Sequence, residues 1–195
     1  DYVLYCLQTL SDDLSTYQYR TLGRQSVPLI IRTRGHRLEG IWHSGSPMGG
    51  LLNFMRGINF LVPRNMTKAA GFYNSIMQTD EPALVIEPLN GYRVKEKMPI
   101  NLGEYCYEFG KIEILKQGKD ISIISYGSTL NLVIDSVPEF DDLGIDVEII
   151  DIQTLIPFDT DKEILMSVRK TNRIIIVDED VPGGASAYIL HKLID

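Results

Sequence analysis

The sequence has few cysteines and no long apolar run. Cys6 and Cys106 are the two cysteines among 195 residues, and they show neither the density of a disulfide framework nor the spacing of a metal site. We therefore expect two ordinary buried thiols and a cytoplasmic location. No stretch approaches the ~20 apolar residues that span a bilayer, and the first residues do not resemble a signal peptide, so we expect no membrane partner.

Positive charge is also scarce. The chain carries 19 lysine and arginine residues against 26 aspartate and glutamate residues, a net charge of -7. Binding of nucleic acid requires clustered positive charge, and no run of lysine or arginine supplies it. We therefore expect no nucleic-acid partner. With 44% hydrophobic residues, the chain is long enough to bury a core of one ordinary domain or two small ones.

The first half of the chain alternates between helix and strand patterns. Apolar residues recur every three or four positions from Val3 to Tyr17, which predicts a helix over residues 2–19. The patterns that follow predict a strand buried on both faces at residues 27–31, a loop at 33–47 and a short apolar segment at 51–55. They then predict a strand at 59–62, a helix at 65–77 and another buried strand at 83–87. This order indicates a parallel sheet with crossover helices.

The composition changes after Pro88, where a polar, turn-rich passage runs to about Gly110. Beyond it, strands are predicted at residues 112–115, 121–125, 147–150 and 173–177, and helices are predicted to open near residue 128, to cover 161–170 and to begin near 185. Pro138 predicts a kink or a restart in the first of these helices, and Gly144 predicts its end. We therefore expect an α/β fold with two doubly wound parallel-sheet units, divided into residues 1–92, a linker at 93–109, and residues 110–195.

The loop from Ile41 to Pro47 carries the most distinctive candidate site. It follows the predicted strand at residues 27–31 and contains His43, one of three histidines. A lone loop histidine more often makes local hydrogen bonds than performs chemistry. Here the small flanking residues bond locally and Pro47 fixes the exit of the loop, so the ring is held in place, as an acid or base must be. His43 is therefore the candidate catalytic residue.

Three motifs in order resemble those of one enzyme family. They are His43-Ser44-Gly45-Ser46-Pro47, the strand end Glu87-Pro88, and the passage from Asp151 to Pro157. Together they resemble the β subunit, or β-like half, of the E1 component of thiamine-diphosphate-dependent 2-oxo acid dehydrogenases. The family typically has glutamine at position 45 and arginine at position 153, where this chain has Gly45 and Gln153. The resemblance implies a partial pyrimidine-binding domain over residues 1–92 and a transketolase C-terminal-like domain, truncated at its end, over 110–195.

The resemblance also implies an activity. It is the oxidative decarboxylation of a 2-oxo acid on thiamine diphosphate, with transfer of the acyl group to lipoamide, and a branched-chain substrate (2-oxoisovalerate) is favoured over pyruvate. His43 is implied to contact the 2-oxo acid or the thiamine-bound intermediate. The family's coenzyme-binding glutamate lies upstream of this chain, so no cofactor-binding residue is assigned. Neither Glu39 nor Glu87 replaces it, and at the strand end Glu87 a structural role is favoured over a catalytic one.

The resemblance further implies partners. They are an E1 α subunit or a fused α-like half, an E2 acyltransferase core, and a second β portion in a homodimer. The α part is expected to hold the diphosphate and Mg²⁺, so no metal ligand is assigned to this chain. Potassium binding around residues 27–30 and 76–81 is left open. We expect the chain alone to be inactive, because its active site is incomplete.

Other interpretations stay open. The segments Tyr126-Gly127-Ser128 and Asp178 to Gly184 could each cradle an anion at a helix start. Neither has the Gly-x-Gly-x-x-Gly pattern, which disfavours a nicotinamide-binding domain, and close helix-to-strand packing is the favoured reason for these glycines. Another thiamine enzyme, such as a transketolase or a deoxyxylulose-phosphate synthase, would need a basic phosphate pocket. A non-catalytic assembly or docking module is the alternative from another class.

Overall fold

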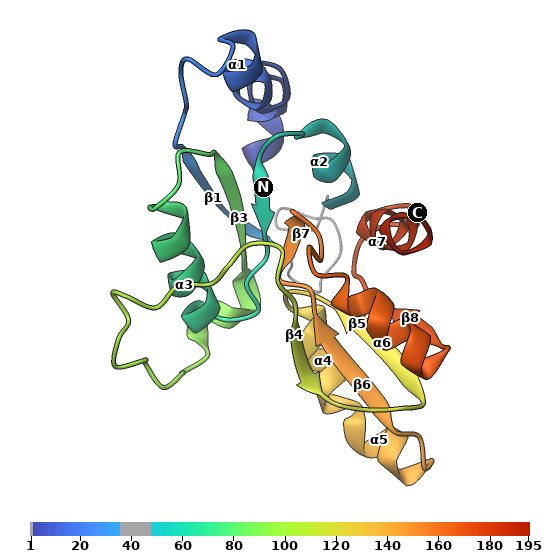
Figure 1. The fold of residues 1–195 in the computed structure, drawn as a ribbon. Coiled ribbons are helices and arrows are strands. Elements are labelled where there is room, and N and C mark those ends of the chain that lie inside the picture. The colour runs from blue at the N-terminus through green and yellow to red at the C-terminus, as the bar shows by residue number, and fades with distance from the viewer. Residues whose placement is uncertain (1, 36–47) are drawn as a thin grey trace.

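The first sheet contains strands from both halves of the chain. The computed structural model describes residues 2–35 and 48–195. Its first sheet has the order β1-β3-β2-β7, formed by β1 (Ile30–Gly35), β3 (Ala83–Pro88), β2 (Asn59–Leu61) and β7 (Thr154–Ile156). The strands β1, β3 and β2 are parallel, and β7 runs antiparallel to β2 (Figure 1). The predicted parallel sheet is confirmed, whereas β7 is a strand that the sequence did not predict.

The second sheet has the order β4-β6-β5-β8, formed by β4 (Glu113–Lys116), β6 (Val147–Asp151), β5 (Ile121–Ser125) and β8 (Ile174–Ile176). Here β4 is antiparallel to β6, and the other pairs are parallel. One face is covered by α4 (Thr129–Asp135) and α5 (Val137–Asp142), and the other by α6 (Glu163–Thr171) and α7 (Ala185–Ile194). The predicted α/β class, with helices on both faces of the second sheet, is confirmed.

The helix α3 (Met66–Ile76) and the strand β3 form as predicted. Asn65 precedes the helix in an extended conformation, and its side-chain oxygen accepts the Lys68 N–H at 2.9 Å, which is a typical N-cap. Phe72 and Ile76 of α3 pack against the sheet, in a cluster with Val85 of β3. Every residue of β3 is buried, as expected for the central strand of a covered parallel sheet. A short helical turn, η3 (Leu89–Arg93), follows β3.

The strand β1 differs from its prediction in position and in burial. It begins at Ile30, so most of the apolar run at residues 27–31 precedes it, and it continues to Gly35. It lies at the edge of the described sheet, and Gly35 is its one fully buried residue. The expectation of a strand buried on both faces was therefore wrong. The charged residues Arg32 and Arg34 are typical of such an edge, because charge discourages pairing with another chain.

The N-terminal helix is confirmed, with irregular turns. It consists of a 3-10 segment η1 (Tyr2–Cys6), a π-helical segment η2 (Thr9–Leu14) and α1 (Ser15–Arg20). The Leu10 carbonyl accepts the backbone N–H of Ser15 and, at 2.7 Å, its hydroxyl, which widens the turn. Of the predicted apolar stripe, Leu10 is buried and its helical neighbours pack on the same core, whereas Tyr17 is exposed.

Proline and glycine end the helices of the second unit as predicted. Pro138 lies in the first turn of α5, where its missing N–H costs nothing, so the expected restart is present. Gly144 adopts φ +70° after α5, and its N–H donates to the Asp141 carbonyl at 3.0 Å. A positive φ of this kind is easiest for glycine, which explains why the helix ends there.

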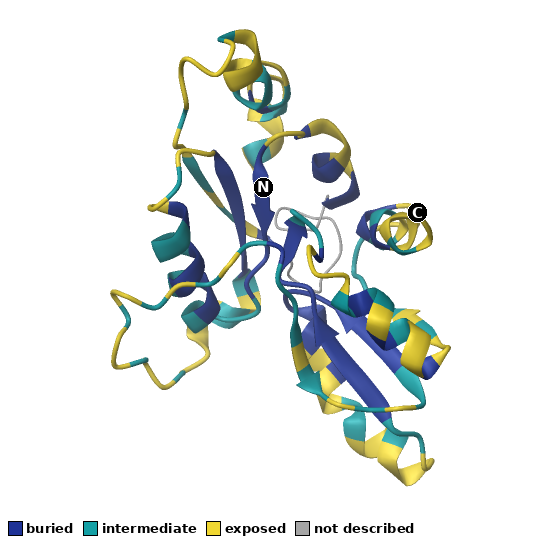
Figure 2. Cartoon of the chain, viewed as in Figure 1, coloured by how far each residue is buried: buried dark blue, intermediate teal, exposed yellow. Residues whose placement is uncertain are grey.

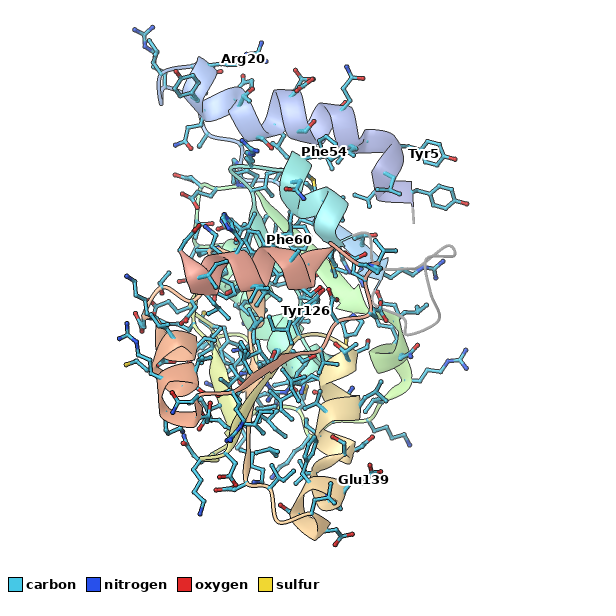
Figure 3. All side chains as sticks on the ribbon, turned by 90° about the vertical axis from the view of Figure 1, so that its right-hand side faces the viewer. Tyr5, Arg20, Phe54, Phe60, Tyr126 and Glu139 are labelled. Carbon is cyan, nitrogen blue, oxygen red and sulfur yellow. The ribbon has the colours of Figure 1, made fainter. Side chains whose placement is uncertain are left out.

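One apolar core connects the two sheets. It contains Phe60 of β2, Ile150 of β6, Leu155 of β7 and Tyr126, all fully buried. The strands at the centre of the molecule are buried, and the outer faces of the helices are exposed (Figure 2). Phe60 and Tyr126 lie in the middle of the molecule, whereas Glu139 lies at its outer end (Figure 3). The division into residues 1–92, 93–109 and 110–195 stays a prediction, and β7 links the last of these ranges to the first sheet.

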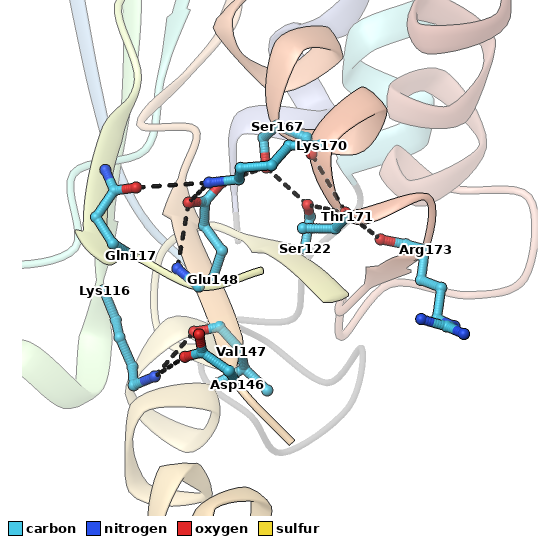
Figure 4. A network of polar contacts seen from close by, with 11 residues as sticks. Lys116, Gln117, Ser122, Asp146, Val147, Glu148, Ser167, Lys170, Thr171 and Arg173 are labelled. Carbon is cyan, nitrogen blue, oxygen red and sulfur yellow. Dashed lines mark hydrogen bonds and ion pairs between the residues drawn. The ribbon is translucent and has the colours of Figure 1, made fainter. Parts of the chain in front are cut away.

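A polar network lies between α6 and the second sheet. The fully buried Glu148 of β6 accepts hydrogen bonds from the Ser167 hydroxyl and the Lys170 ammonium (Figure 4). The Ser122 hydroxyl bonds with those of Ser167 and Thr171, each at 2.7 Å. Because buried polar groups are costly without partners, these bonds allow a charged residue inside the sheet and fix how α6 lies on it. No helix in the described ranges is long and apolar enough to cross a membrane.

Candidate active-site region at the junction of the two sheets

Strands of the two sheets end close together. Arg64 follows β2 and donates from Nη1 to the carboxylate of Asp151, at the end of β6, at 2.8 Å. The next strand, β7, pairs directly with β2. In parallel α/β sheets, ligands bind beyond the C-terminal ends of the strands. The junction is therefore the candidate active-site region.

The predicted catalytic residue, His43, lies outside the described residues, as do Glu39 and Gly45, so their placement stays a prediction. The described residues that flank this segment are well anchored. Gly35 is buried at the end of β1, opposite Pro88 of β3. Met48 is fully buried at the start of α2 (Met48–Phe54). The segment that carries His43 therefore joins the C-terminal end of β1 to the start of α2.

Two grooves lie beside these anchors. One, of about 570 Å³, runs between the N-terminal helix and the C-terminal half of β1, and its lining includes Leu10, Ile31 and Thr33. The other, of about 420 Å³, lies at the start of α2, and its lining includes Asn53 and Asp180. Both grooves are mainly apolar; the first also carries Arg32 and Arg34, and the second carries the carboxylate of Asp180.

Two aspartates accept hydrogen bonds from the backbone N–H groups at the start of α7. Asp180 Oδ2 accepts the Ala185 N–H at 3.2 Å, and Asp178 Oδ2 accepts the Ser186 N–H at 2.9 Å. The Tyr126 hydroxyl donates to Asp178 Oδ1 at 2.6 Å, and burial together with this carboxylate raises the pKa of Tyr126 well above its usual value. The chain's own carboxylates thus take donors that an anion would need at this helix start. The structure supports a packing role for this segment over phosphate binding.

Glu87 is held by four donors at the end of β3. Arg32 donates from Nε at 2.7 Å and from Nη2 at 2.9 Å, and the hydroxyls of Tyr73 and Tyr92 each donate at 2.5 Å. Burial alone would raise the pKa of Glu87, but the bonds from Arg32 and the two tyrosines outweigh it and hold the pKa below its usual value. Burial and the bond to Glu87 raise the pKa of Tyr92 to about 12. A carboxylate with this many partners is a structural group, as the sequence favoured.

A cluster of charges spans the junction, and the sequence motifs did not point to it. Arg64 pairs with Glu113 of β4 as well as with Asp151, and Lys68 of α3 pairs with Glu113 at 2.6 Å. The Lys68 ammonium also lies 3.4 Å from the centre of the Tyr107 ring. Complete burial raises the pKa of Asp151 to about 6 despite Arg64, and burial lowers the pKa of Lys68. We name these four charged residues the junction cluster.

Gln153, which stands where the family has arginine, is part of the same junction. Its side chain is buried and its φ is +60°. The N–H donates to Asp151 Oδ1 at 3.2 Å, and the carbonyl accepts the Val62 N–H at 2.8 Å. Within the part of the chain that the structure describes, the side-chain Oε1 has no hydrogen-bond partner. The backbone of Gln153 thus holds the residue in place, and the contacts of its side-chain amide do not point to any ligand.

Both cysteines are exposed, which corrects the expectation of buried thiols. Cys6 lies on the N-terminal helix, where it lines the same groove as Val3 and Leu10, and Cys106 lies in the passage before β4. Cys6 borders an open groove and Cys106 lies in a surface passage, so the apolar character of a thiol did not determine its burial.

The groups in the described ranges that were considered for a metal ion or a diphosphate have partners within the chain or form no cluster. Within residues 2–35 and 48–195, no group of three His, Cys, Asp or Glu side chains could hold a metal. Of the carbonyls considered for potassium, that of Ile76 accepts both the N–H and the hydroxyl of Thr79 at 3.0 Å, and that of Leu29 accepts the Ala83 N–H at 2.9 Å. These carbonyls serve the local fold, and the donors at the start of α7 are occupied. We assign no coenzyme or metal contact to these groups.

The fold and the sequence both match known proteins. Residues 110–195 match the family model of the transketolase C-terminal domain. A solved structure described as "Split gene transketolase, inactive beta4 tetramer" superposes with a TM-score of 0.76 over 99% of this chain and 59% of that chain, at 17% identity. At this identity the likeness establishes the fold alone, and it confirms the transketolase-like class.

Curated relatives cover nearly the whole chain. The β subunit of mitochondrial 2-oxoisovalerate dehydrogenase from Chaetomium thermophilum is 33% identical over 97% of this chain and 41% of its own length. The β subunit of the pyruvate dehydrogenase E1 component from Bacillus subtilis is 28% identical over 100% of this chain and 60% of its own length. The chain thus spans about half the length of the curated relatives that it matches. Over nearly its whole length the chain is similar to the β subunits of 2-oxo acid dehydrogenases, and its residues 110–195 match the transketolase C-terminal domain family.

Proposed function

We propose that this chain forms the β portion of the E1 component of a 2-oxo acid dehydrogenase complex. The observation that carries the proposal is the similarity to β subunits over nearly the whole chain. The geometry supports it, because strands of both sheets end at one junction and the segment with His43 leaves β1 on that side. The reaction is the decarboxylation of a 2-oxo acid on thiamine diphosphate, followed by acyl transfer to lipoamide.

In this proposal, His43 is the acid–base residue that contacts the 2-oxo acid and assists acyl transfer. Thiamine diphosphate supplies the carbanion chemistry when it is bound, and the protein supplies orientation and proton transfer. As the resemblance implies, we assign the diphosphate and Mg²⁺ to the α subunit or to a fused α-like half. Potassium binding around residues 27–30 and 76–81 stays open, and we do not include it in the proposal.

Replacement of His43 tests the proposal. In the assembled enzyme that contains this chain, His43→Ala is expected to lower kcat about 100-fold or more, the usual worth of a positioned acid–base group. His191→Ala is the matched control, because His191 lies exposed on α7 and pairs with Asp195, the residue that follows this helix. The control is expected to retain full activity. A non-catalytic docking module would keep all of its function in both variants, and that result would overturn the proposal.

The substrate that we propose is a branched-chain 2-oxo acid. The two 2-oxoisovalerate dehydrogenase β subunits are 33% and 32% identical to this chain, against 30% and 28% for the pyruvate dehydrogenase β subunits from Acholeplasma laidlawii and Bacillus subtilis. The assembled enzyme is expected to show a higher kcat/KM for 2-oxoisovalerate than for pyruvate in an assay of lipoamide reduction. A preference for pyruvate would contradict the choice of substrate without affecting the choice of enzyme class.

The proposed partners follow from the same class of enzyme. They are the α subunit or α-like half, an E2 acyltransferase core and a second β portion, and we propose that the chain alone is inactive. Co-purification with an α part and gain of turnover on mixing would support this, and turnover by the isolated chain would contradict it. We retain a cytosolic location in the proposal, because both cysteines are unpaired in the described structure. Cell fractionation tests that part.

A further inference from the structure

We infer that Asp180 is a positioning residue that fixes the start of α2, where the segment that carries His43 ends. The inference rests on the proposed function of His43, but its structural part stands on described residues. Asp180 belongs to the loop between β8 and α7 and thus to the transketolase C-terminal domain. α2 follows the strand β1 of the first sheet.

The Asp180 carboxylate bonds to both helix starts at once. Its Oδ2 accepts the Gly49 N–H at 2.7 Å and the Ala185 N–H at 3.2 Å, and its Oδ1 accepts the Val181 N–H at 2.8 Å. Asp180 and Gly49 are 131 positions apart in the chain. N–H groups at a helix start lack partners within the helix, and a carboxylate there is favoured by charge as well as by hydrogen bonding. One side chain thus joins the starts of α2 and α7.

Two glycines make the contact possible. A Cβ added to Gly49 would lie 2.5 Å from the Gly184 Cα, so the two backbones touch. A Cβ added to Gly184 would lie 2.1 Å from Asp180 Oδ2. Neither backbone can therefore carry a side chain without displacing the aspartate or separating the helices. By contrast, a Cβ added to Gly50, the next residue of α2, meets no atom within 4 Å.

The start of α2 also cannot shift along the core. Met48, the first residue of α2, is fully buried in the core that contains Ala185 and Ile189 of α7. His43 lies five positions before Met48 in the sequence. A catalytic ring requires placement to a fraction of an ångström, which depends on how firmly the ends of its segment are held. Through Asp180, the C-terminal domain therefore helps to position the segment that carries His43, which joins β1 of the first sheet to α2.

The variant Asp180→Asn separates the effect of the carboxylate charge from that of the side-chain size. Asp180→Asn keeps the size but removes the charge that favours both helix starts. Whichever way the amide is turned, its NH2 group faces an N–H donor, either that of Val181 or those of Gly49 and Ala185, so the bond to Gly49 is weakened. Hydrogen exchange measured by mass spectrometry on the assembled enzyme is expected to be about 10-fold faster in peptides covering residues 48–54, as expected for loss of a helix cap. Unchanged exchange in these peptides would overturn the inference.

The glycine pair provides the matched control if Asp180→Asn folds poorly. Gly49→Ala is expected to reproduce the faster exchange, and Gly50→Ala is expected to match the unaltered enzyme. In both Asp180→Asn and Gly49→Ala, kcat is expected to fall about 10-fold, and the pKa in the pH profile of kcat/KM assigned to His43 is expected to shift, which a general loss of stability does not cause. An unaltered kcat and pH profile alongside faster exchange would overturn the positioning role. Full activity of His43→Ala would instead overturn the proposed function, so the two failures are distinguishable.

Discussion

Replacing Glu87 with glutamine tests whether this carboxylate is structural. The side chain is 3% exposed and accepts two bonds from Arg32 and one each from Tyr73 and Tyr92. Glutamine keeps the shape but replaces one accepting oxygen with an amide that faces donors. Two of the four bonds are lost, and at about 1.5 kcal/mol for each bond to a charged group the free energy of unfolding falls by about 3 kcal/mol. The Arg32 side chain is 64% exposed, so its share is discounted and this value is an upper estimate.

The effect of Glu87→Gln also depends on pH, with a defined sign. Because the pKa of Glu87 is lowered in the folded state, its contribution is present above the unfolded pKa of about 4.3 and is lost as the pH falls through the folded value. Urea unfolding followed by circular dichroism should therefore show the full loss at pH 7 and a smaller one below pH 4. Tyr92→Phe, which removes one bond, is the control and should cost about 1 kcal/mol. A Glu87→Gln variant of unaltered stability but reduced activity would refute the structural role.

Three further predictions concern buried groups. In the unaltered protein the free energy of unfolding should decline by about 3 kcal/mol as the pH rises from about 4 to 6, because the folded pKa of Asp151, about 6, lies above the unfolded value of 3.8. Asp151→Asn should remove this decline. Urea unfolding at both pH values measures it, and an unaltered pH dependence in the variant would contradict the prediction. Phe60→Ala should lower the free energy of unfolding by about 3–5 kcal/mol in urea unfolding, because this ring of β2 is fully buried; a loss below about 1 kcal/mol would contradict the packing. Ser167→Ala should lower it by about 2 kcal/mol, because Glu148 loses a buried donor, and an unaltered Tm would count against the network.

The sequence predicted best where local and tertiary preferences agree. β3 is apolar at nearly every position and is buried on both faces, and α3 has a capping asparagine at its start. Both were predicted within one residue of their ends. β1 was misplaced by three residues, because the apolar run that precedes it reads as a strand, whereas the strand that forms carries arginines at a sheet edge.

β7 could not be predicted from local pattern. It is three residues long and pairs with a strand more than ninety positions earlier in the chain, Phe60 opposite Ile156. A strand this short is stabilised by its tertiary partner, and the residues from Thr154 to Ile156 carry no alternation of their own. The motif from Asp151 to Pro157 was recognised by resemblance alone, and its physical role in joining the sheets emerged from the pairing.

The site was predicted in part. His43 was selected because its flanking residues are distinctive, and its placement stays a prediction. The contact of Asp180 with Gly49 was missed because the segment was considered as an anion site, which its charge disfavours, or as close helix-to-strand packing, and the aspartate itself was assigned no contact. The sequence did contain a sign of a capping role, because an aspartate followed by a glycine pair stands just before a predicted helix, and such an aspartate often caps the helix. The partner of Asp180 at Gly49 depends on a contact between distant segments, which no local pattern reveals.

The junction cluster shows why this chain keeps charges inside its core. Arg64 and the fully buried Asp151 gain little net stability from pairing, since burying both ions costs about as much as their attraction returns. An apolar contact at the same place would hold the sheets together equally well but would allow them to slide. A guanidinium that must reach both Glu113 and Asp151 accepts few relative positions of β2, β4 and β6. The charges therefore favour one relative orientation of the two sheets at this junction.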